Sequence, residues 1–198
     1  MKLVQLLLTI LALFSITAST PAPEPADDQV VDAGFTQAIA GMNGWYVSDV
    51  TVTAVSPVLA NGRLLQAGEI LSISSEGEQS IEYASPNGQS TATQIVRIDK
   101  TPPTVSINAP YLRGDGATIL SITVSDPVSH PAAVDVSLDN GLTWQTYTIP
   151  SGFSEPEVVW NLNIDPTQVH PGQTTILARG LDMAGNSSSI TTFVGTGR

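Results

Sequence analysis

Alternation of apolar and polar residues is the feature of this 198-residue chain that most limits its fold. Leu120, Ile122 and Val124 alternate with polar residues, and so do Val134 and Val136. A period of two places one side of an extended strand in a core and the other side in water. Beyond the N-terminal region, no run keeps the 3.6-residue period of an amphipathic helix. The alternation therefore predicts an all-β protein.

Turn-forming segments rich in Gly, Pro, Asn and Asp divide the alternating runs into two groups. The first group predicts strands at residues 50–56, 69–74, 80–85 and 91–99. The second predicts about seven strands, the number in a small two-sheet sandwich, at residues 103–108, 118–126, 133–139, 143–150, 158–164, 174–182 and 189–195. Between the groups lies DKTPP, whose paired prolines favour a stiff, extended joint. We predict one module over residues 44–100 and a second over 101–198.

The N-terminus has the arrangement of a secretory signal peptide. Lys2 precedes an apolar run over residues 3–16, and small residues follow at 18–20. This run is shorter than the roughly 20 residues of a bilayer-spanning helix. We predict a signal peptide over residues 1–19, a secreted, periplasmic or cell-surface protein, and no membrane span in the mature chain; an uncleaved anchor is the alternative.

Residues 20–43 are expected to form a linker. The stretch TPAPEPADD is rich in proline and acidic residues, which favours an extended chain. Behind it, Val31, Phe35 and Ile39 lie four residues apart, the spacing of one face of a helix. A short amphipathic helix is therefore expected at the end of the linker.

The charge balance limits the partners. The chain has 7 Lys and Arg against 18 Asp and Glu, a net charge of −11, and no cysteine. Nucleic acids are bound through clustered basic residues, so a nucleic-acid partner is excluded. Without cysteine the fold has no disulfide and no lipid-modified cysteine. An acidic surface instead suits solubility or a divalent cation.

Several segments resemble the bacterial Ig-like and fibronectin-like repeats of secreted and surface proteins. In the first half these are NGWYVSDVTVTAVS, GEQSIEYAS and VRIDKTPPTVSI, and in the second half SLDNGLTWQTYTIP and ARGLDMAGNSSS. The resemblance covers roughly residues 44–194 and implies two tandem Ig-like β-sandwich modules. Such modules serve as spacers, stalks and binding units, which implies a structural spacer or an adhesion module at the cell envelope or outside the cell. The first half has SPNG where the family has D-x-A-G-N, so it lacks that aspartate.

The segment SLDNGLTW fits the pattern S-x-D-x-G-x-T-W, the Asp-box known from sialidases and other glycan-handling proteins. Its physical interpretation is a hairpin, because an aspartate can accept amide hydrogen bonds across a turn whose Asn and Gly tolerate positive φ. The tryptophan can fold back as an apolar plug. The residues of this predicted structural turn are Ser137, Asp139, Gly141, Thr143 and Trp144.

No catalytic residue is predicted. A glycosidase needs two carboxyl groups that face each other across the substrate, and a sialidase also needs clustered arginines. The arginines beyond the signal segment are widely spread: Arg63, Arg97, Arg113, Arg179 and Arg198. His130 and His170 each precede a proline and are expected in solvated loops, since no metal-binding spacing accompanies them. The chain is predicted not to be an enzyme; a glycan-binding or glycan-active Asp-box protein is the alternative.

Calcium is the one cofactor that the sequence suggests. Asp182 and Asn186 lie in the turn LDMAGNS, Asp126 ends another predicted strand, and Asp99 lies at the predicted joint. Carboxylate and amide oxygens are the ligands that Ca²⁺ prefers. Asp126, Asp182 and Asn186 are therefore candidate calcium ligands. The alternative is that Asp182 and Asn186 only hold their turn through side-chain hydrogen bonds.

Exposed aromatic residues are candidates for a surface that binds a protein or a glycan at the cell envelope. Trp160 is in phase with apolar neighbours and is expected in a core, and Trp45 and Tyr46 are expected to cover the first module. Trp144 and Tyr147 remain as the candidate ligand surface. In a regular strand they point to opposite faces.

Overall fold

The computed structural model describes residues 34–108, 110–112, 118–150, 152–165 and 175–194. The predicted signal peptide, most of the predicted linker, Arg113, His170 and Arg198 lie outside these residues. The described part of the chain consists of strands joined by turns, and no helix there could cross a membrane. The all-β class predicted from the alternation is confirmed.

The N-terminal half forms two antiparallel sheets. One sheet has the order β1-β2-β5, with β1 (Phe35–Gln37), β2 (Val50–Thr53) and β5 (Ile70–Ile73). The other has the order β4-β3-β6-β7, with β3 (Val58–Ala60), β4 (Arg63–Leu65), β6 (Gly77–Ala84) and β7 (Thr91–Ile98). Their inner faces share one core, which runs from Val50 to Ile98 and includes half-buried Tyr46. These two sheets are called the first sandwich.

The C-terminal half forms two further antiparallel sheets. One has the order β13-β10-β8, with β8 (Thr104–Ile107), β10 (Thr118–Ser125) and β13 (Glu157–Ile164), and β9 (Tyr111–Leu112) also pairs with β10. The other has the order β12-β11-β14-β15, with β11 (Pro131–Ser137), β12 (Gln145–Thr148), β14 (Thr175–Asp182) and β15 (Thr191–Val194). They enclose a separate core, against which Trp160 packs. These sheets are called the second sandwich.

The alternation accounts for the second core. Leu120, Ile122 and Val124 of β10 are fully buried, whereas the serines and threonines between them lie on the outer face. β14 alternates in the same way, with Ile176 and Ala178 turned inward. Burial of each such side chain stabilises the fold by about 1.5–3 kcal/mol relative to its exposure.

The short helix predicted near residues 31–39 is wrong for its described part. Phe35–Gln37 is strand β1, which pairs antiparallel with β2 in the register Phe35↔Thr53. β2 offers a free edge of backbone donors and acceptors, with which residues 35–37 form hydrogen bonds. A helix shorter than about 12 residues would be only marginally stable by itself. The four-residue spacing is therefore coincidental.

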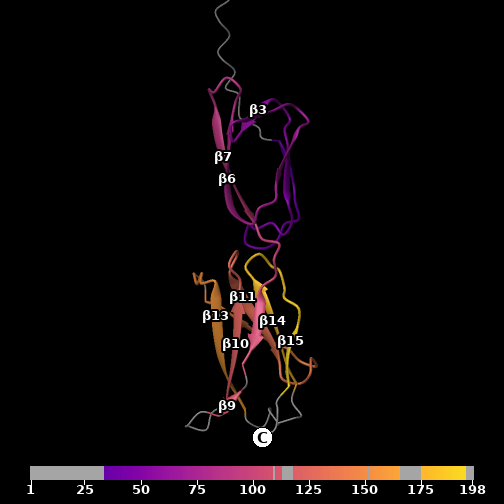
Figure 1. The fold of residues 1–198 in the computed structure, drawn as a ribbon, viewed down its shortest axis with the longest axis vertical. Coiled ribbons are helices and arrows are strands. Elements are labelled where there is room, and N and C mark those ends of the chain that lie inside the picture. Colours follow the sequence, from indigo (N-terminus) through magenta and orange to yellow (C-terminus); the bar gives the residue numbers. More distant parts are fainter. Residues whose placement is uncertain (1–33, 109, 113–117, 151, 166–174, 195–198) are drawn as a thin grey trace, which may run out of the picture.

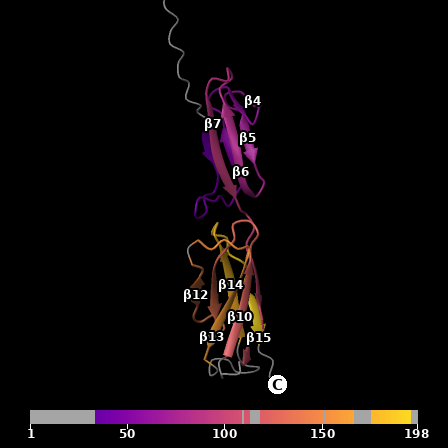
Figure 2. The same ribbon diagram turned by 90° about the vertical axis from the view of Figure 1, so that its left-hand side faces the viewer.

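Figures 1 and 2 show the two sandwiches end to end along the longest axis of the molecule. β7 ends at Ile98 and β8 begins at Thr104, so the DKTPP segment connects them. The division into two independently folding modules at residue 100 stays a prediction. The end-to-end arrangement matters because it brings the turns of both sandwiches together at the connection.

Candidate metal centre at the junction

Three buried aspartates meet where the two sandwiches join. Asp99 directly follows β7, Asp126 directly follows β10, and Asp182 is the last residue of β14. One carboxylate oxygen from each lies within 4.8 Å of the corresponding oxygens of the other two. The structure thus brings together two of the candidate calcium ligands, Asp126 and Asp182, and adds Asp99 from the first sandwich. We call these three residues the aspartate cluster.

Two members of the cluster bind a local turn with one oxygen only. Asp126 Oδ1 accepts hydrogen bonds from the backbone N–H groups of residues 128–130 at 2.9–3.1 Å. Asp99 Oδ1 accepts one from the N–H of Thr101 at 3.1 Å. Asp99 Oδ2 and Asp126 Oδ2 are buried without a hydrogen-bond partner among the described residues. A buried carboxylate oxygen in this state is unfavourable, which points to a missing ligand.

Asn186 connects the third carboxylate to the first sandwich. Its backbone N–H donates to Asp182 Oδ1 at 2.8 Å, and its Nδ2 donates to Asp182 Oδ2 at 2.9 Å. The same Nδ2 also donates to the backbone carbonyl of Asp99 at 3.0 Å. Asp182 and Asn186 therefore hold their turn, as the alternative interpretation of this motif expects. Asn186 also bridges the two sandwiches, and its side-chain nitrogen points toward the Asp182 carboxylate.

The electrostatics of the cluster oppose three unprotonated carboxylates. Burial raises the pKa of Asp99 and the charges of Asp126 and Glu76 raise it further, whereas the nearby Ser129 hydroxyl and the hydrogen bond from the Thr101 N–H partly offset this rise. Burial likewise raises the pKa of Asp182, and the charges of Asp99 and Asp126 add to it against the hydrogen bonds from Asn186. Buried carboxylates this close together are stable only if a proton neutralises part of their negative charge or a cation compensates for it.

The basic residues near the junction are engaged elsewhere. Lys100 Nζ pairs with Asp49 at 2.8 Å and also donates to the carbonyl of Ser74. Arg179, on the far side of β14, pairs with Asp135 at 2.6 Å. Among the described residues no Lys or Arg pairs with the aspartate cluster. The compensating charge therefore does not come from a Lys or Arg side chain of the described residues.

The three carboxylate oxygens of the cluster are close enough together to share one cation. Two oxygens bound to one Ca²⁺ at about 2.4 Å can be at most about 4.8 Å apart. The three carboxylate oxygens lie within that limit of one another. Three ligands leave room for carbonyl oxygens or water in the six to eight positions that Ca²⁺ usually fills.

Two hydrogen bonds to backbone carbonyls also connect the sandwiches beside the cluster. The N–H of Met42 donates to the carbonyl of Ala184 at 2.8 Å, and Asn43 Nδ2 donates to the carbonyl of Met183 at 2.9 Å. A Cβ at Gly41 would lie 2.3 Å from the oxygen of Ala184, so only glycine allows this approach. The segment before Tyr46 therefore packs on the turn that carries Asp182 and Asn186.

The Asp-box residues form a hydrogen-bonded hairpin turn. Thr143 donates to the two oxygens of Asp139 from its N–H at 2.8 Å and its hydroxyl at 2.6 Å. Ser137 Oγ donates to Asp139 Oδ1 and accepts from the N–H of Gly141, both at 2.8 Å. Asn140 and Gly141 have φ of 58° and 87°, as the turn requires. Hydrogen bonds from Thr143 and then Ser137 lower the pKa of Asp139.

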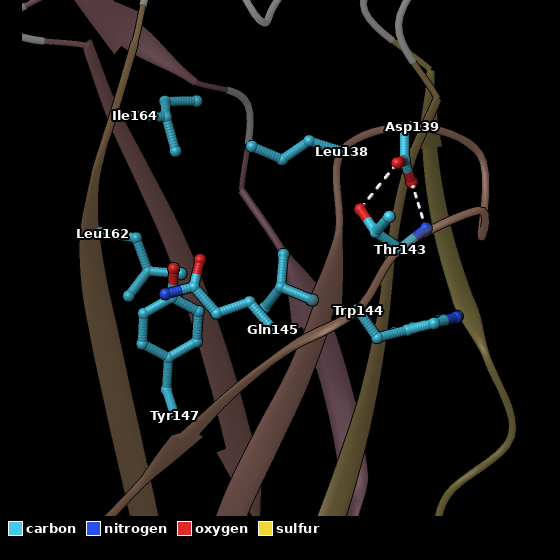
Figure 3. A pocket seen from close by; sticks show the side chains of 9 residues that line it. Leu138, Asp139, Thr143, Trp144, Gln145, Tyr147, Leu162 and Ile164 are labelled. Carbon is cyan, nitrogen blue, oxygen red and sulfur yellow. Dashed lines mark hydrogen bonds between the residues drawn. The ribbon is translucent and has the colours of Figure 1, made fainter.

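Trp144 and Tyr147 lie on opposite sides of their strand (Figure 3), and their role as a ligand surface stays a prediction. Figure 3 shows their rings on opposite sides of the chain, with Tyr147 toward Leu162 and Trp144 away from it. Tyr147 and Trp144 both line a cavity of about 310 Å³, and Asp139 is the only acidic residue among the described residues that line it. Trp144 is 38% exposed, with the guanidinium of Arg179 5.6 Å from its ring centre. It therefore packs on an arginine instead of plugging the core.

Sequence reasoning missed part of the site. Asp99 was placed at the joint, but nothing along the chain indicates its distance from Asp126 and Asp182, because that depends on how the sandwiches are stacked. Ser129 was missed as well; its hydroxyl accepts from the N–H of Ala184 at 3.2 Å. His130 lies beside the cluster, with its Nδ1 3.4 Å from the carbonyl of Asp126 and a positive φ of 71°.

Comparisons with known proteins find matches among solved structures alone. No family model matches the chain, and no curated protein matches it. Among solved structures, a chain from the structures of the Clostridium thermocellum CbhA fibronectin(III)-like modules is similar at 18% identity and a TM-score of 0.32. The match covers 82% of this chain and 95% of that one. The fold assignment rests on the sheets and cores described above.

Proposed function

We propose that this chain is an exported, non-enzymatic protein that acts as a structural spacer or binding module at the cell envelope or outside the cell. In this proposal a calcium ion at the aspartate cluster joins the two sandwiches into one stiff rod. The observation that carries it is the convergence of Asp99, Asp126 and Asp182 from both sandwiches, with two buried oxygens unpartnered.

The chemistry of the cluster favours calcium over the alternatives. Protonation could neutralise the carboxylates, but at neutral pH it competes poorly with a divalent ion for which all ligands are hard oxygens. Zinc prefers histidine and cysteine ligands, which the cluster does not contain. Extracellular modules of this kind bind Ca²⁺ with dissociation constants of about 10⁻⁴–10⁻³ M, which suits an exported protein.

A non-enzymatic role is supported by the cavity in the second sandwich. Its walls include Val136, Leu138, Leu162 and Ile164, and among the described lining residues Asp139 is the single carboxylate. Both oxygens of Asp139 accept hydrogen bonds within the turn. Glycoside hydrolysis needs two opposed carboxyl groups, one of them with a raised pKa, whereas the pKa of Asp139 is lowered.

Small-angle X-ray scattering of the full chain without its signal segment tests the stiffening. In calcium, we expect the scattering of the wild type to fit an extended molecule with a narrow range of angles between the sandwiches. In chelator, we expect a wider range of angles and a shorter maximum dimension. Asp126→Asn should bend in both conditions, because the amide keeps an acceptor for residues 128–130 but loses the charge that binds the ion. Asp49→Asn removes an acid near the junction but outside the cluster, and should behave as the wild type.

Export is tested separately. Expression of the full chain in a bacterial host should yield a periplasmic or secreted product that begins near residue 20. A product that keeps residues 1–19 and remains in the cytoplasm would contradict the predicted location. That result would leave the calcium site unaffected.

A further inference from the structure

The aspartate cluster is closed to solvent in the described part of the chain. Asp99, Asp126 and Asp182 are 0%, 1% and 2% exposed, and the two carboxylate oxygens without a hydrogen-bond partner are buried. A hydrated calcium ion cannot reach a buried oxygen unless the protein opens. Entry of a cation at this site therefore requires part of the protein to move away.

Residues 41–46 of the first sandwich, which we call the strap, cover the turn that follows β14. The N–H of Met42 donates to the carbonyl of Ala184 at 2.8 Å, and Asn43 Nδ2 donates to the carbonyl of Met183 at 2.9 Å. Ala184 is 0% exposed, although connections between strands usually run over the surface. The burial of this turn therefore depends on the first sandwich.

The strap moves together with Asp99, because both are attached to the end of β7. The N–H of Tyr46 donates to the carbonyl of Arg97 at 2.8 Å, and the N–H of Asp99 donates to the carbonyl of Tyr46 at 2.9 Å. Asp126 and Asp182 belong to the second sandwich. Separation of the sandwiches would therefore lift the strap from the turn and withdraw Asp99 from the other two carboxylates in one movement.

The contact that holds the strap closed is small. Figures 1 and 2 show the two sandwiches meeting at their ends. Hydrogen bonds across this contact join Met42 to Ala184, Asn43 to Met183 and Asn186 to Asp99. Met42 and Asn43 are exposed, so their hydrogen bonds lie near the surface. A contact of this kind opens at a lower free-energy cost than a packed core.

We infer that calcium enters and leaves the aspartate cluster only when the two sandwiches separate at the strap. This inference rests on the proposed calcium site and adds its regulation, because opening of the junction then controls exchange of the ion. An exposed site with a dissociation constant of about 10⁻⁴ M would release its ion at roughly 10⁵ s⁻¹, since diffusion alone would limit association. An ion in the closed junction has to wait for an opening. By linkage, the bound ion in turn holds the sandwiches together.

Stopped-flow mixing of the calcium-loaded chain with a fluorescent calcium chelator measures the release. We expect a single rate for the wild type, slower than about 10³ s⁻¹ and independent of chelator concentration. Asn43→Gly tolerates the φ of 53° but removes the hydrogen bond to Met183, so release should be at least about threefold faster. Asn161→Ala is the matched control, because it removes an exposed hydrogen bond from Ser121 within the second sandwich, and it should leave the rate unchanged.

A covalent tether across the strap gives a second test. The chain has no cysteine, and Asn43 Nδ2 lies 3.9 Å from the sulfur of Met183. Asn43→Cys combined with Met183→Cys, joined by a short bis-maleimide, should therefore hold the junction closed. We expect the tethered chain to take up and release calcium about tenfold more slowly, or slower still, than the same double variant before it is joined.

Three results would overturn this inference and leave the calcium site in place, because a calorimetric titration measures the binding separately. The first is a wild-type release rate that rises with chelator concentration, which would show that the chelator reaches the ion in the closed junction. The second is equal release from Asn43→Gly and Asn161→Ala. The third is a tethered chain that exchanges calcium as fast as the unjoined one. A chain that binds no calcium would overturn both the inference and the proposed function.

Discussion

Asp139 and Asp126 both lie in turns that follow a strand, yet their carboxylate oxygens differ in hydrogen bonding. Both oxygens of Asp139 accept hydrogen bonds, and its pKa is lowered. Asp126 binds its turn with one oxygen and leaves the other buried and unpartnered. The first carboxylate is satisfied by the protein itself, whereas the second requires something from outside.

The lowered pKa of Asp139 can be measured directly. A carboxyl whose pKa is lowered by folding stabilises the fold above its unfolded pKa, and this contribution is lost as the pH falls through the folded value. We expect the Asp139 carboxyl to titrate below an ordinary aspartate in a ¹³C NMR titration. Thr143→Val removes the hydroxyl donor and should raise the midpoint, whereas Thr148→Val should leave it unchanged. A Thr143→Val midpoint equal to that of the wild type would contradict the assignment.

The aspartate cluster should give the opposite pH dependence in chelator. The pKa values of Asp99 and Asp182 are raised by burial. Their contribution to stability is therefore fully present below the unfolded pKa and is lost as the pH rises through the folded values. The melting temperature in chelator should fall as the pH rises above about 4, the ordinary range of an aspartate, and Asp182→Asn should reduce that fall. An identical pH profile in the wild type and Asp182→Asn would contradict this account.

Single residues were predictable where the chemistry is local. The pattern S-x-D-x-G-x-T-W predicted the hydrogen-bonded turn because all its partners lie within eight residues. Asp126, Asp182 and Asn186 were predicted to supply oxygen ligands for calcium from turns. Their convergence with Asp99 could not be predicted, since Asp99 is separated from Asn186 by 87 residues.

At the scale of elements, alternation predicted the strands of four or more residues and missed those of two or three. β10 and β13 have eight residues each, enough for a period of two to be evident. The hairpin of β3 and β4 consists of two three-residue strands around Asn61 and Gly62, and it was identified only as a turn. β1 was predicted as a helix, because its pairing with β2 cannot be read from local spacing.

The close packing of the two sheets in the second sandwich depends on Gly180 in β14. A Cβ there would lie 2.8 Å from Val105 Cγ2 and 2.8 Å from Val124 Cγ1. Gly180→Ala should therefore lower the free energy of unfolding by about 1–3 kcal/mol in urea titrations, the usual cost of overpacking. Adding Val105→Ala should restore part of the loss, so the double variant should fall short of the sum of the singles. Strict additivity would contradict the contact.

At the scale of the whole molecule, the junction depends on one close backbone approach as well as on the aspartate cluster. Gly41→Ala places a Cβ against the carbonyl of Ala184 without changing any carboxylate. We expect this variant to keep both sandwiches folded, as judged by circular dichroism, and to broaden the scattering distribution even in calcium. A variant as stiff as the wild type would show that the aspartate cluster alone sets the arrangement.

A calorimetric titration of calcium into the chain tests the central claim most directly. We predict one saturable site with a dissociation constant of about 10⁻⁴–10⁻³ M. The site should be lost in Asp126→Asn and in Asp99→Asn, which come from different sandwiches, and kept in Asp49→Asn. Absence of saturable binding in the wild type, or equal binding in all four chains, would contradict the account.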